Sequence, residues 1–251
     1  MVKAIMHGCN GHMGRVITDL IAQDNDIEIV AGVDANTETA NDYPVFSSID
    51  ECDVSADVII DFAVAAAVDG LLDYAVKTQT PVVLCTTGLS DEQIKKMEEA
   101  SKEVAILKSA NMSLGINTLV KLLRTATDVL ADRGYDIEIV EKHHNLKADA
   151  PSGTAYLLAD SINEVKDGKY EYIFDRSQRN QKRAENELGM SAVRGGNIVG
   201  EHTVIYAGTD EVIEIKHTAY SKAVFGKGAI DAAKFLVGKS VGMYDMSDVI
   251  D

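Results

Sequence analysis

A glycine-rich turn near the N-terminus constrains the fold of this chain more than any other stretch. It follows a compact apolar run, Val2–His7, and reads Gly-Cys-Asn-Gly-His-Met-Gly over Gly8–Gly14. A helical apolar pattern over 15–23 comes next, and a second apolar run over 27–33 leads to Asp34. A strand, a glycine turn, a helix, a strand and an acid about 20 residues after the turn are typical of a βαβ unit that binds a dinucleotide. The chain is therefore expected to contain such a unit.

The three glycines of the turn have separate expected roles. Gly8 and Gly11 would let the backbone approach the pyrophosphate, and Gly14 would let the helix pack tightly on the strand. The spacing GxxGxxG is a variant of the commoner GxGxxG, and a glycine triplet alone is weak evidence. The prediction therefore depends on the strands, the helix and the acid around it.

The residues after Asp34 predict a preference for NADH. A carboxylate accepts a hydrogen bond from a ribose 2′-hydroxyl but repels a 2′-phosphate, so enzymes that use NADPH usually place an arginine or lysine nearby. Here Ala35 and Asn36 follow the acid. Arg15 and His12 are the cations that would support NADPH as an alternative cofactor if their side chains reach the adenosine end.

The rest of the first half alternates between apolar strand-like runs and helical patterns. The expected strands are 56–62, 81–84 and 104–107, and the expected helices are 63–77 and 90–102. This alternation predicts a parallel sheet with helices on both faces, which binds ligands at the carboxyl ends of its strands. Two turns that follow these strands, Thr86-Thr87-Gly88 and Ala110-Asn111-Met112, are expected to line the nicotinamide pocket, although ordinary turn chemistry explains each equally well.

A basic segment in the middle of the chain, 138–155, reads EIVEKHHNLKADAPSGTA and is the best candidate for catalysis. It begins as a strand-like run and then places Lys142, His143, His144 and Lys147 within six positions. Histidine titrates near neutrality and serves as a general acid or base, and a lysine beside other cations gives up its proton more readily. A solvated basic loop is the alternative explanation. No metal site is expected, because adjacent histidines on a strand point apart and no cysteine or third histidine lies at ligand spacing.

A helix is expected to start directly after this loop. Pro151 has the preset φ of a first helical turn, and Ser152 can cap free amides. A helical apolar pattern follows over 155–165. The N–H groups of Gly153 and Thr154 would then lie at the positive end of the helix, which suits a carboxylate or a phosphate.

The second half of the chain has a different pattern. A long helix is expected over 114–130, crossing between two domains, and a final helix over 226–237 is expected to pack back on the first domain. The polar, glycine-rich stretch 178–200 is expected to be a long loop. Consecutive strand-like runs predict an antiparallel sheet, with strands at 170–174, 203–207 and 211–217.

Composition argues against several classes of function. The formal net charge of −16 disfavours nucleic acid as a partner, because no basic face is available to neutralise phosphates. No apolar stretch approaches the ~20 residues that span a bilayer, and the N-terminal MVKAIMHG does not have the architecture of a signal peptide. The three cysteines are far apart and include no CxxC pair, which indicates free thiols in a reducing cytoplasm. These observations predict a cytoplasmic protein with neither a nucleic-acid nor a membrane partner.

Five motifs together resemble the 4-hydroxy-tetrahydrodipicolinate reductase family, also called dihydrodipicolinate reductases, of bacterial lysine and diaminopimelate biosynthesis. They cover nearly the whole chain and are GCNGHMG (Gly8–Gly14), TTG (Thr86–Gly88), ANMSLGIN (Ala110–Asn117), EKHHNLKADAPSGTA (Glu141–Ala155) and RGGNIVGEHT (Arg194–Thr203). The resemblance implies an α/β fold. A Rossmann-like dinucleotide-binding domain would cover 1–114 and 222–251, and an α+β substrate-binding domain with a mainly antiparallel sheet would cover 115–221 and build a homotetramer.

The resemblance also implies an activity. The enzyme would use NAD(P)H to reduce 4-hydroxy-tetrahydrodipicolinate, a small cyclic dicarboxylate, to tetrahydrodipicolinate with loss of water. His143 would be the proton donor or acceptor, and Lys147 the proton donor. Three residues would bind substrate, His144, Gly153 and Thr154, the last two by holding a carboxylate. The implied cofactor-binding residues are Gly8, Cys9, Asn10, Gly11, His12, Met13, Asp34, Cys85, Thr86, Thr87, Ser109, Ala110, Asn111 and Met112.

Two positions depart from the family pattern. Cys85 stands where many members have glycine, and no effect on the chemistry is expected, because the backbone makes the contact there. Ala35 stands where some members have arginine, which counts against NADPH.

Two other functions fit parts of the sequence. Another dehydrogenase with this layout would usually have a catalytic cysteine, and Cys85 or Cys9 would have to serve. A dinucleotide-sensing regulator would be expected to carry a DNA-binding segment or a sensor surface. The net charge of −16 and the lack of a basic helix argue against the regulator.

Overall fold

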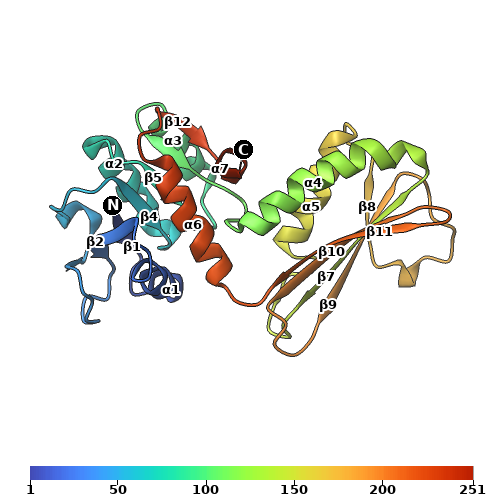
Figure 1. Cartoon of the computed structure of the whole chain (residues 1–251), viewed down its shortest axis with the longest axis horizontal. Helices are drawn as coiled ribbons and strands as arrows, with labels where there is room; N and C mark the ends of the chain where they lie inside the picture. The colour runs from blue at the N-terminus through green and yellow to red at the C-terminus, as the bar shows by residue number, and fades with distance from the viewer. Residues whose placement is uncertain (251) are drawn as a thin grey trace. The chain divides into compact units, whose positions relative to one another are not determined.

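The computed structural model describes residues 1–250, which form two compact units (Figure 1). Unit 1 comprises Met1–Leu114 and the residues from Ala223 onward, and unit 2 comprises Gly115–Lys222. Unit 2 is therefore inserted in sequence between two parts of unit 1. No helix of the described residues is long and apolar enough to cross a membrane.

Unit 1 is built on a seven-stranded parallel sheet with the strand order β12-β6-β5-β4-β1-β2-β3. Its strands are β1 (Val2–His7), β2 (Ile27–Val33), β3 (Val45–Phe46), β4 (Val58–Asp61), β5 (Val82–Leu84), β6 (Ala105–Leu107) and β12 (Gly242–Tyr244). Its helices are α1 (His12–Ile21), α2 (Val68–Thr78), α3 (Asp91–Ala100), α6 (Ala223–Leu236) and α7 (Met246–Ile250), with 3₁₀ turns η1 (Ile49–Glu51) and η2 (Ala65–Ala67). The strand order reverses between β1 and β4, and sheets of this kind bind ligands at the carboxyl ends of the strands beside such a switch point.

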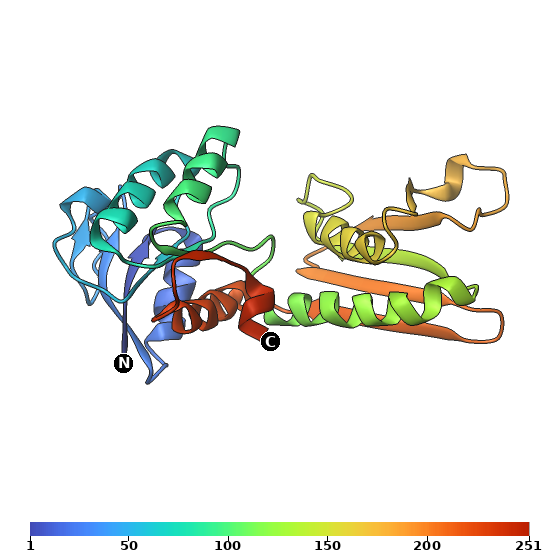
Figure 2. The ribbon, with the colours of Figure 1, turned by 90° about the horizontal axis from the view of Figure 1, so that it is seen from above.

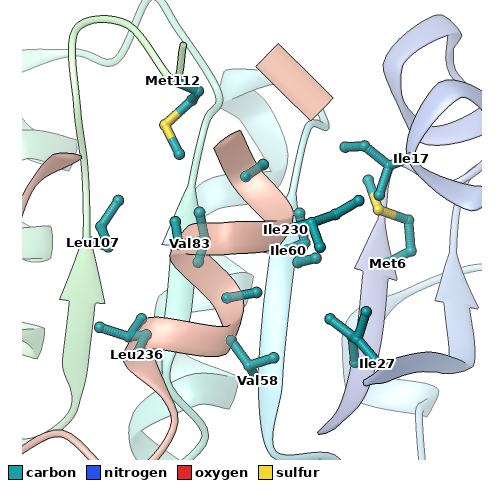
Figure 3. Packing of buried hydrophobic residues seen from close by; sticks show 14 of the residues in the cluster. Met6, Ile17, Ile27, Val58, Ile60, Val83, Leu107, Met112, Ile230 and Leu236 are labelled. Atoms are coloured by element: carbon teal, nitrogen blue, oxygen red, sulfur yellow. The ribbon is translucent and has the colours of Figure 1, made fainter. Parts of the chain in front are cut away.

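Because successive side chains of the central strands point to opposite faces of the sheet, they pack into two separate cores. Ile5 and Ile59 belong to the core with α2 and α3, whereas Met6 and Ile60 belong to the core with α1 and α6. Figure 3 shows the second core, in which Ile230 of α6 lies beside Ile60 of β4. Helices therefore cover both faces of the sheet, which confirms the arrangement that the strand–helix alternation predicts.

Most predicted elements of unit 1 are confirmed to within a few residues. The strand expected over 27–33 has these bounds, and the helices expected over 90–102 and 226–237 are α3 and α6. α3 begins with a capping box, in which Ser90 Oγ accepts a hydrogen bond from Gln93 N and Gln93 Oε1 accepts one from Ser90 N. β3, β12 and α7 have no counterpart among the predicted elements, because strands of two or three residues and a five-residue helix show too little periodicity to be recognised.

Unit 2 contains a five-stranded sheet with two helices on one of its faces (Figures 1 and 2). The strand order is β11-β10-β7-β9-β8, with β7 (Asp136–His143), β8 (Glu171–Phe174), β9 (Glu187–Arg194), β10 (Gly200–Ala207) and β11 (Val212–Ala219). The helices are α4 (Leu114–Leu130) and α5 (Gly153–Val165), with 3₁₀ turns η3 (Ala131–Arg133) and η4 (Arg176–Gln178). Alternate strand residues, such as Ile137 and Val204, form the core with Leu123 of α4 and Leu158 of α5.

The prediction of a mainly antiparallel second sheet is wrong. β10 runs antiparallel to β7 and β11, but β9 runs parallel to both β7 and β8, so the sheet is mixed. The prediction of a loop over 178–200 is also wrong, because this stretch contains β9. β9 includes Gly189, where a Cβ would overlap the side chain of Glu138 on β7. Glycine at this position makes room for the Glu138 carboxylate and weakens the strand pattern in the sequence.

Candidate active site

The glycine turn joins β1 to α1 and lies directly against backbone. Gly8 has a φ of +82°, and a Cβ at this position would lie 2.7 Å from the carbonyl oxygen of Phe62. A Cβ at Gly14 would lie under 3.0 Å from the carbonyl oxygens of Gly8 and Cys9. Both positions therefore require glycine, Gly8 for its conformation and Gly14 for space alone. Gly14 thus packs tightly, but against the turn at Gly8 and Cys9, whereas the sequence predicts packing against the strand.

A pocket of about 570 Å³ lies at the carboxyl ends of β1 to β4, beside the switch point of the sheet. Four of the expected cofactor-binding residues line it: Gly8, Asn10, Gly11 and Asp34. Two backbone amides hold Asp34, because its Oδ2 accepts a hydrogen bond from Asn10 N (2.9 Å) and its Oδ1 accepts one from Asn36 N (2.9 Å). A fixed carboxylate suits ribose hydroxyls, and glycines that let the backbone of a turn come close suit a pyrophosphate. The residues present therefore fit a nicotinamide dinucleotide.

The other residues expected from the same turn lie outside the lining of this pocket. Cys9 is buried in the core, His12 is exposed at the start of α1, and Met13 is half-buried beside it. Burial, with a smaller contribution from Asp34, raises the pKa of the Cys9 thiol to about 11. Burial also raises the pKa of Cys85 well above its usual value. Neither cysteine is a thiolate at neutral pH, so neither suits the cysteine chemistry that another dehydrogenase would need.

The turns after β5 and β6 carry the remaining predicted cofactor residues. After β5, Thr86 is buried and Thr87 is exposed; after β6, Ser109 and Asn111 are half-buried, Ala110 is exposed and Met112 is buried in the core. Both turns lie at the carboxyl edge of the sheet, as expected from the strand pattern. Their contact with the nicotinamide stays a prediction.

A buried pair at the pocket, His7 and Asp61, has no counterpart in the sequence predictions, and His7 lines the pocket. His7 Nδ1 and Asp61 Oδ1 are 2.7 Å apart, and Asp61 is fully buried. Asp61 also accepts hydrogen bonds from the N–H groups of Ala63 (3.2 Å) and Thr86 (3.3 Å). The carboxylate thus ties the turns after β4 and β5 together. His7 and Asp61 are the last residues of their strands, which is the signal by which the sequence could have revealed them.

In unit 2, the candidate catalytic loop is built around a buried carboxylate, Glu141, near the end of β7. Strand alternation puts Glu141 and His143 on the same face, and Glu141 Oε2 lies 2.6 Å from His143 Nδ1. Arg194, the last residue of β9, donates to both carboxylate oxygens at 2.7 and 2.8 Å. Burial raises the pKa of Glu141, but the hydrogen bonds from Arg194 and His143 outweigh it, so the pKa lies below its usual value. Glu141 is therefore an ionised acceptor at neutral pH.

The helix expected after the loop begins at Gly153, and Ser152 is its N-cap, as predicted. Ser152 Oγ accepts a hydrogen bond from Ala155 N (3.2 Å) and lies 3.0 Å from His202 Nε2. Ser152 N donates to Glu141 Oε1 (3.1 Å), which joins the helix start to the catalytic loop. A Cβ added at Gly153 would meet no atom within 4 Å, so the positive end of α5 is open at this residue.

The other predicted residues of this site belong to the same loop and helix start. Lys147 Nζ forms an ion pair with Asp149 Oδ1 (2.8 Å), and its side chain is 22% exposed. His144 and Thr154 are half-buried. Arg194 donates to the carbonyl oxygen of Asp149 (2.5 Å), which connects this ion pair to the buried carboxylate. The loop and the strand ends therefore form one connected polar network.

Residues of this network that are absent from the predicted site include Glu141, Arg194 and His202. Glu141 has a local signal, because it precedes His143 by two positions in a strand. Arg194 and His202 come from β9 and β10, and only the sheet register places them opposite His143 and Glu141.

His202 is expected to make the protein less stable as the pH falls below its ordinary pKa. Burial, followed by the effect of His143, lowers the pKa of His202 from 6.5 to about 4. Between these values the unfolded chain carries a proton on this residue and the folded protein does not, so the free energy of unfolding falls as the pH decreases. At about 1.4 kcal/mol per pKa unit, the loss reaches about 3 kcal/mol near pH 4.

Urea unfolding at about pH 7.5 and about pH 5 measures this loss. His202→Gln keeps a hydrogen-bonding group beside Ser152 but does not titrate, so it should lose less stability than the wild type between the two pH values. His12→Gln is the control, because it replaces an exposed histidine that lies outside this buried network. Equal losses in the wild type and in His202→Gln would contradict the prediction.

The fold and the two sites define a class of protein: an oxidoreductase with one unit for a nicotinamide dinucleotide and another that carries acid–base groups. The family model described as dihydrodipicolinate reductase, N-terminus, matches residues 2–112, and the model described as dihydrodipicolinate reductase, C-terminus, matches residues 115–250. The chain belongs to the dihydrodipicolinate reductase family, whose members are oxidoreductases of lysine and diaminopimelate biosynthesis.

Relatives of known name are similar to the chain over its full length. A 4-hydroxy-tetrahydrodipicolinate reductase from Caldanaerobacter subterraneus subsp. tengcongensis is 53% identical over 250 residues, covering 100% of this chain and 98% of that protein. A protein of the same name from Clostridium tetani is 49% identical over 251 residues, with 100% and 98% covered.

Among solved structures, a dipicolinate-bound dihydrodipicolinate reductase from Paenisporosarcina sp. TG-14 has a TM-score of 0.82 at 21% identity, covering 98% of this chain and 97% of that chain. A DAP dehydrogenase from C. glutamicum has a TM-score of 0.61 at 16% identity, covering 100% and 95%. At these identities the likeness shows the fold.

Proposed function

We propose that this chain reduces 4-hydroxy-tetrahydrodipicolinate with NADH as the preferred cofactor, and that the loop of His143 and Lys147 supplies the proton. The reaction adds a hydride and a proton to the substrate and releases one water, which gives tetrahydrodipicolinate. The bound dinucleotide supplies the hydride. One observation carries the proposal: Glu141 joins the imidazole of His143 to the open amino end of α5, so a proton donor and an anion-binding group belong to one site.

A dicarboxylate substrate fits the charges of this site. Gly153 and Thr154 form the first turn of α5, whose positive end favours a carboxylate. His144 and Lys147 add two side chains that can carry positive charge. The acidic surface elsewhere matters little, because salt screens charges beyond about 8 Å. The similar structure from Paenisporosarcina is described as dipicolinate-bound, and dipicolinate is also a cyclic dicarboxylate.

Proton transfer is assigned to His143 and Lys147. A hydride added to an unsaturated carbon leaves negative charge on the neighbouring atom, and a positioned acid neutralises that charge. His143 Nδ1 is held by Glu141, so Nε2 is the nitrogen that exchanges a proton. Lys147 is held by Asp149 at the edge of the same network and is the second group that can donate this proton.

NADH is expected to give a higher kcat/KM than NADPH, by at least about tenfold, which corresponds to ~1.4 kcal/mol. Asp34 and Ala35 both line the pocket, and Asp34 is fixed by two amides, so a 2′-phosphate would meet a carboxylate that does not rotate away. Initial rates of NADH and NADPH oxidation give the ratio. A higher kcat/KM with NADPH would overturn this preference and point to Arg15, whose Nε donates to the carbonyl oxygen of Asn10 (3.1 Å).

The activity is tested with the purified protein and substrate generated in situ, from pyruvate and aspartate semialdehyde by a synthase. Oxidation of NADH or NADPH that depends on the synthase and on both of its substrates supports the proposal. Folded protein that binds NADH but shows no turnover with either cofactor contradicts it.

We further propose a homotetramer in the cytoplasm, assembled through the sheet of unit 2. In the described part of unit 2, α4 and α5 cover one face of this sheet, while Val140, Val193, Thr203 and Ile205 alternate onto the other. Val193 is 45% exposed, and burial of such side chains against a second copy favours association. The three cysteines are free, which suits a reducing compartment. A mass near four times 27.1 kDa by light scattering supports the tetramer, and a monomer mass contradicts it.

A further inference from the structure

The carboxylate of Glu141 accepts hydrogen bonds from three directions while almost fully buried. Its Oε2 faces His143 Nδ1 (2.6 Å) and Arg194 Nη1 (2.8 Å), and its Oε1 faces Arg194 Nη2 (2.7 Å) and Ser152 N (3.1 Å). Glu141 is 1% exposed. A rotation of the carboxylate would break several charge-assisted bonds at once, so it has one orientation.

The charged and titratable groups around the His143 ring come from three strands and the loop. Glu141 on β7 and Arg194 on β9 form a bidentate ion pair, which balances their charges. His202 on β10 packs edge-on against His143, with ring centroids 5.1 Å apart, and burial lowers its pKa to about 4, so it is neutral near pH 7. Lys147 in the loop is itself paired with a carboxylate. Glu141 is thus the acceptor that His143 Nδ1 meets, and Nδ1 carries a proton whether or not the ring is charged.

The other ring nitrogen is not covered by the neighbouring strand. A Cβ added at Gly200, on β10, would lie 3.2 Å from His143 Nε2. Any side chain at this position would crowd Nε2, so glycine keeps residue 200 of β10 from blocking this nitrogen. A ring fixed at Nδ1, with glycine opposite Nε2, has the geometry of an oriented acid or base.

We propose that Glu141 is a positioning residue that fixes the Nδ1–H tautomer and the orientation of His143. Arg194 and the Ser152 amide fix Glu141 in turn. Because the Ser152 amide belongs to the start of α5, one carboxylate sets both the imidazole and the helix end that would receive the substrate. This inference rests on the proposed role of His143 in proton transfer.

Glu141→Gln removes the charge and keeps the shape of the side chain. We expect kcat to fall on the order of 100-fold, with the KM for NADH changed by less than about threefold. Glu141→Asp is the second variant. It keeps the charge that compensates Arg194, so it should fold, but it is one methylene shorter and should also lose kcat.

The ¹³C chemical shifts of the His143 ring report its tautomer without any need for turnover. The neutral ring of the wild type should show the Nδ1–H form, and Glu141→Gln should shift the population toward the Nε2–H form. Glu138→Gln is the matched control, because Glu138 is also a β7 carboxylate paired with an arginine, Arg183 at 2.5 Å, but lies on the opposite face of the strand. It should leave kcat and the tautomer unchanged.

The results separate this inference from the function on which it rests. An unchanged tautomer and an unchanged kcat in folded Glu141→Gln would overturn the positioning role, whatever the role of His143. Wild-type kcat in His143→Gln would instead overturn the proposed proton transfer by His143, and with it the catalytic meaning of the Glu141 contact.

Discussion

Replacing Lys147 by alanine is expected to lower kcat by roughly 10²–10⁴-fold, the usual contribution of a positioned acid. The Lys147 ammonium is paired with Asp149, and Arg194 bonds the Asp149 carbonyl oxygen, so the lysine is held at the edge of the network that contains His143. NADH affinity should be unchanged, because the dinucleotide pocket is lined entirely by residues of unit 1 and Lys147 belongs to unit 2. Steady-state kcat and NADH binding followed by fluorescence measure the two effects separately.

Lys142→Ala is the matched control for this experiment. Lys142 lies five residues before Lys147, on the face of β7 opposite to that of His143. Its ammonium is 3.5 Å from Glu201, and its side chain is 40% exposed. Its loss should change kcat by less than about twofold, since exposed ion pairs contribute little. If Lys147→Ala also kept kcat within about threefold, Lys147 would be a structural cation and the proton would have to come from elsewhere.

Replacing Gly14 by alanine is expected to raise the Kd for NADH on the order of 100-fold, because a displacement of about 1 Å in a binding group can have this effect. The new Cβ would lie under 3.0 Å from the carbonyl oxygens of Gly8 and Cys9. These are backbone atoms that cannot rotate aside, so α1 or the turn must shift, and the phosphate-binding amides shift with it. The overpacking should also lower the free energy of unfolding by about 1–3 kcal/mol. Titration of NADH and urea unfolding give both quantities.

Gly70→Ala provides the control, because Gly70 lines the same pocket from α2 but has room for a side chain. A Cβ there would meet only Ile49 Cγ2, at 3.9 Å. The Kd for NADH should stay within about threefold, and the helix should become more stable by up to ~1 kcal/mol, since alanine is the better helix former. Equal Kd values for Gly14→Ala and the wild type would mean that the turn tolerates displacement and does not position the pyrophosphate.

The parts of the fold that the sequence predicts are those with strong local periodicity. β1 and β2 have the predicted bounds, as does α4, because continuous apolar runs and a 17-residue amphipathic pattern are legible without knowledge of their neighbours. The strand pattern of β9 is not recognisable in this way, because it is interrupted by Gly189, which makes space for the Glu138 side chain of β7. The mixed order of the second sheet has no local signal at all, because β9 pairs in parallel with β7, which lies more than forty residues earlier.

The candidate site likewise contains residues that local spacing predicts and residues that only the paired strands reveal. Gly8, Gly14 and Asp34 belong to one contiguous βαβ pattern, and His143 and Lys147 belong to one loop, so their association is predictable from spacing. Arg194 becomes a functional candidate only through its bidentate contact with Glu141, which joins strands β9 and β7. A sequence pattern predicts which residues could carry the chemistry, whereas the sheet register determines which groups hold them in place.

The insertion of unit 2 into unit 1 has a consequence for the order in which the chain can fold during synthesis. Unit 2 is contiguous, so its sheet and both helices are complete once residue 222 has left the ribosome. Unit 1 is not complete at that stage, because α6 supplies Ala229, Ile230, Ala233 and Leu236 to the core over β4 and β5, and β12 forms the edge of its sheet. The first segment to be made therefore keeps an apolar face uncovered until nearly the last residues emerge. A nascent chain that stalls after residue 222 presents that face to chaperones and to other nascent chains. Docking of α6 is therefore the step that completes the core of the cofactor-binding unit.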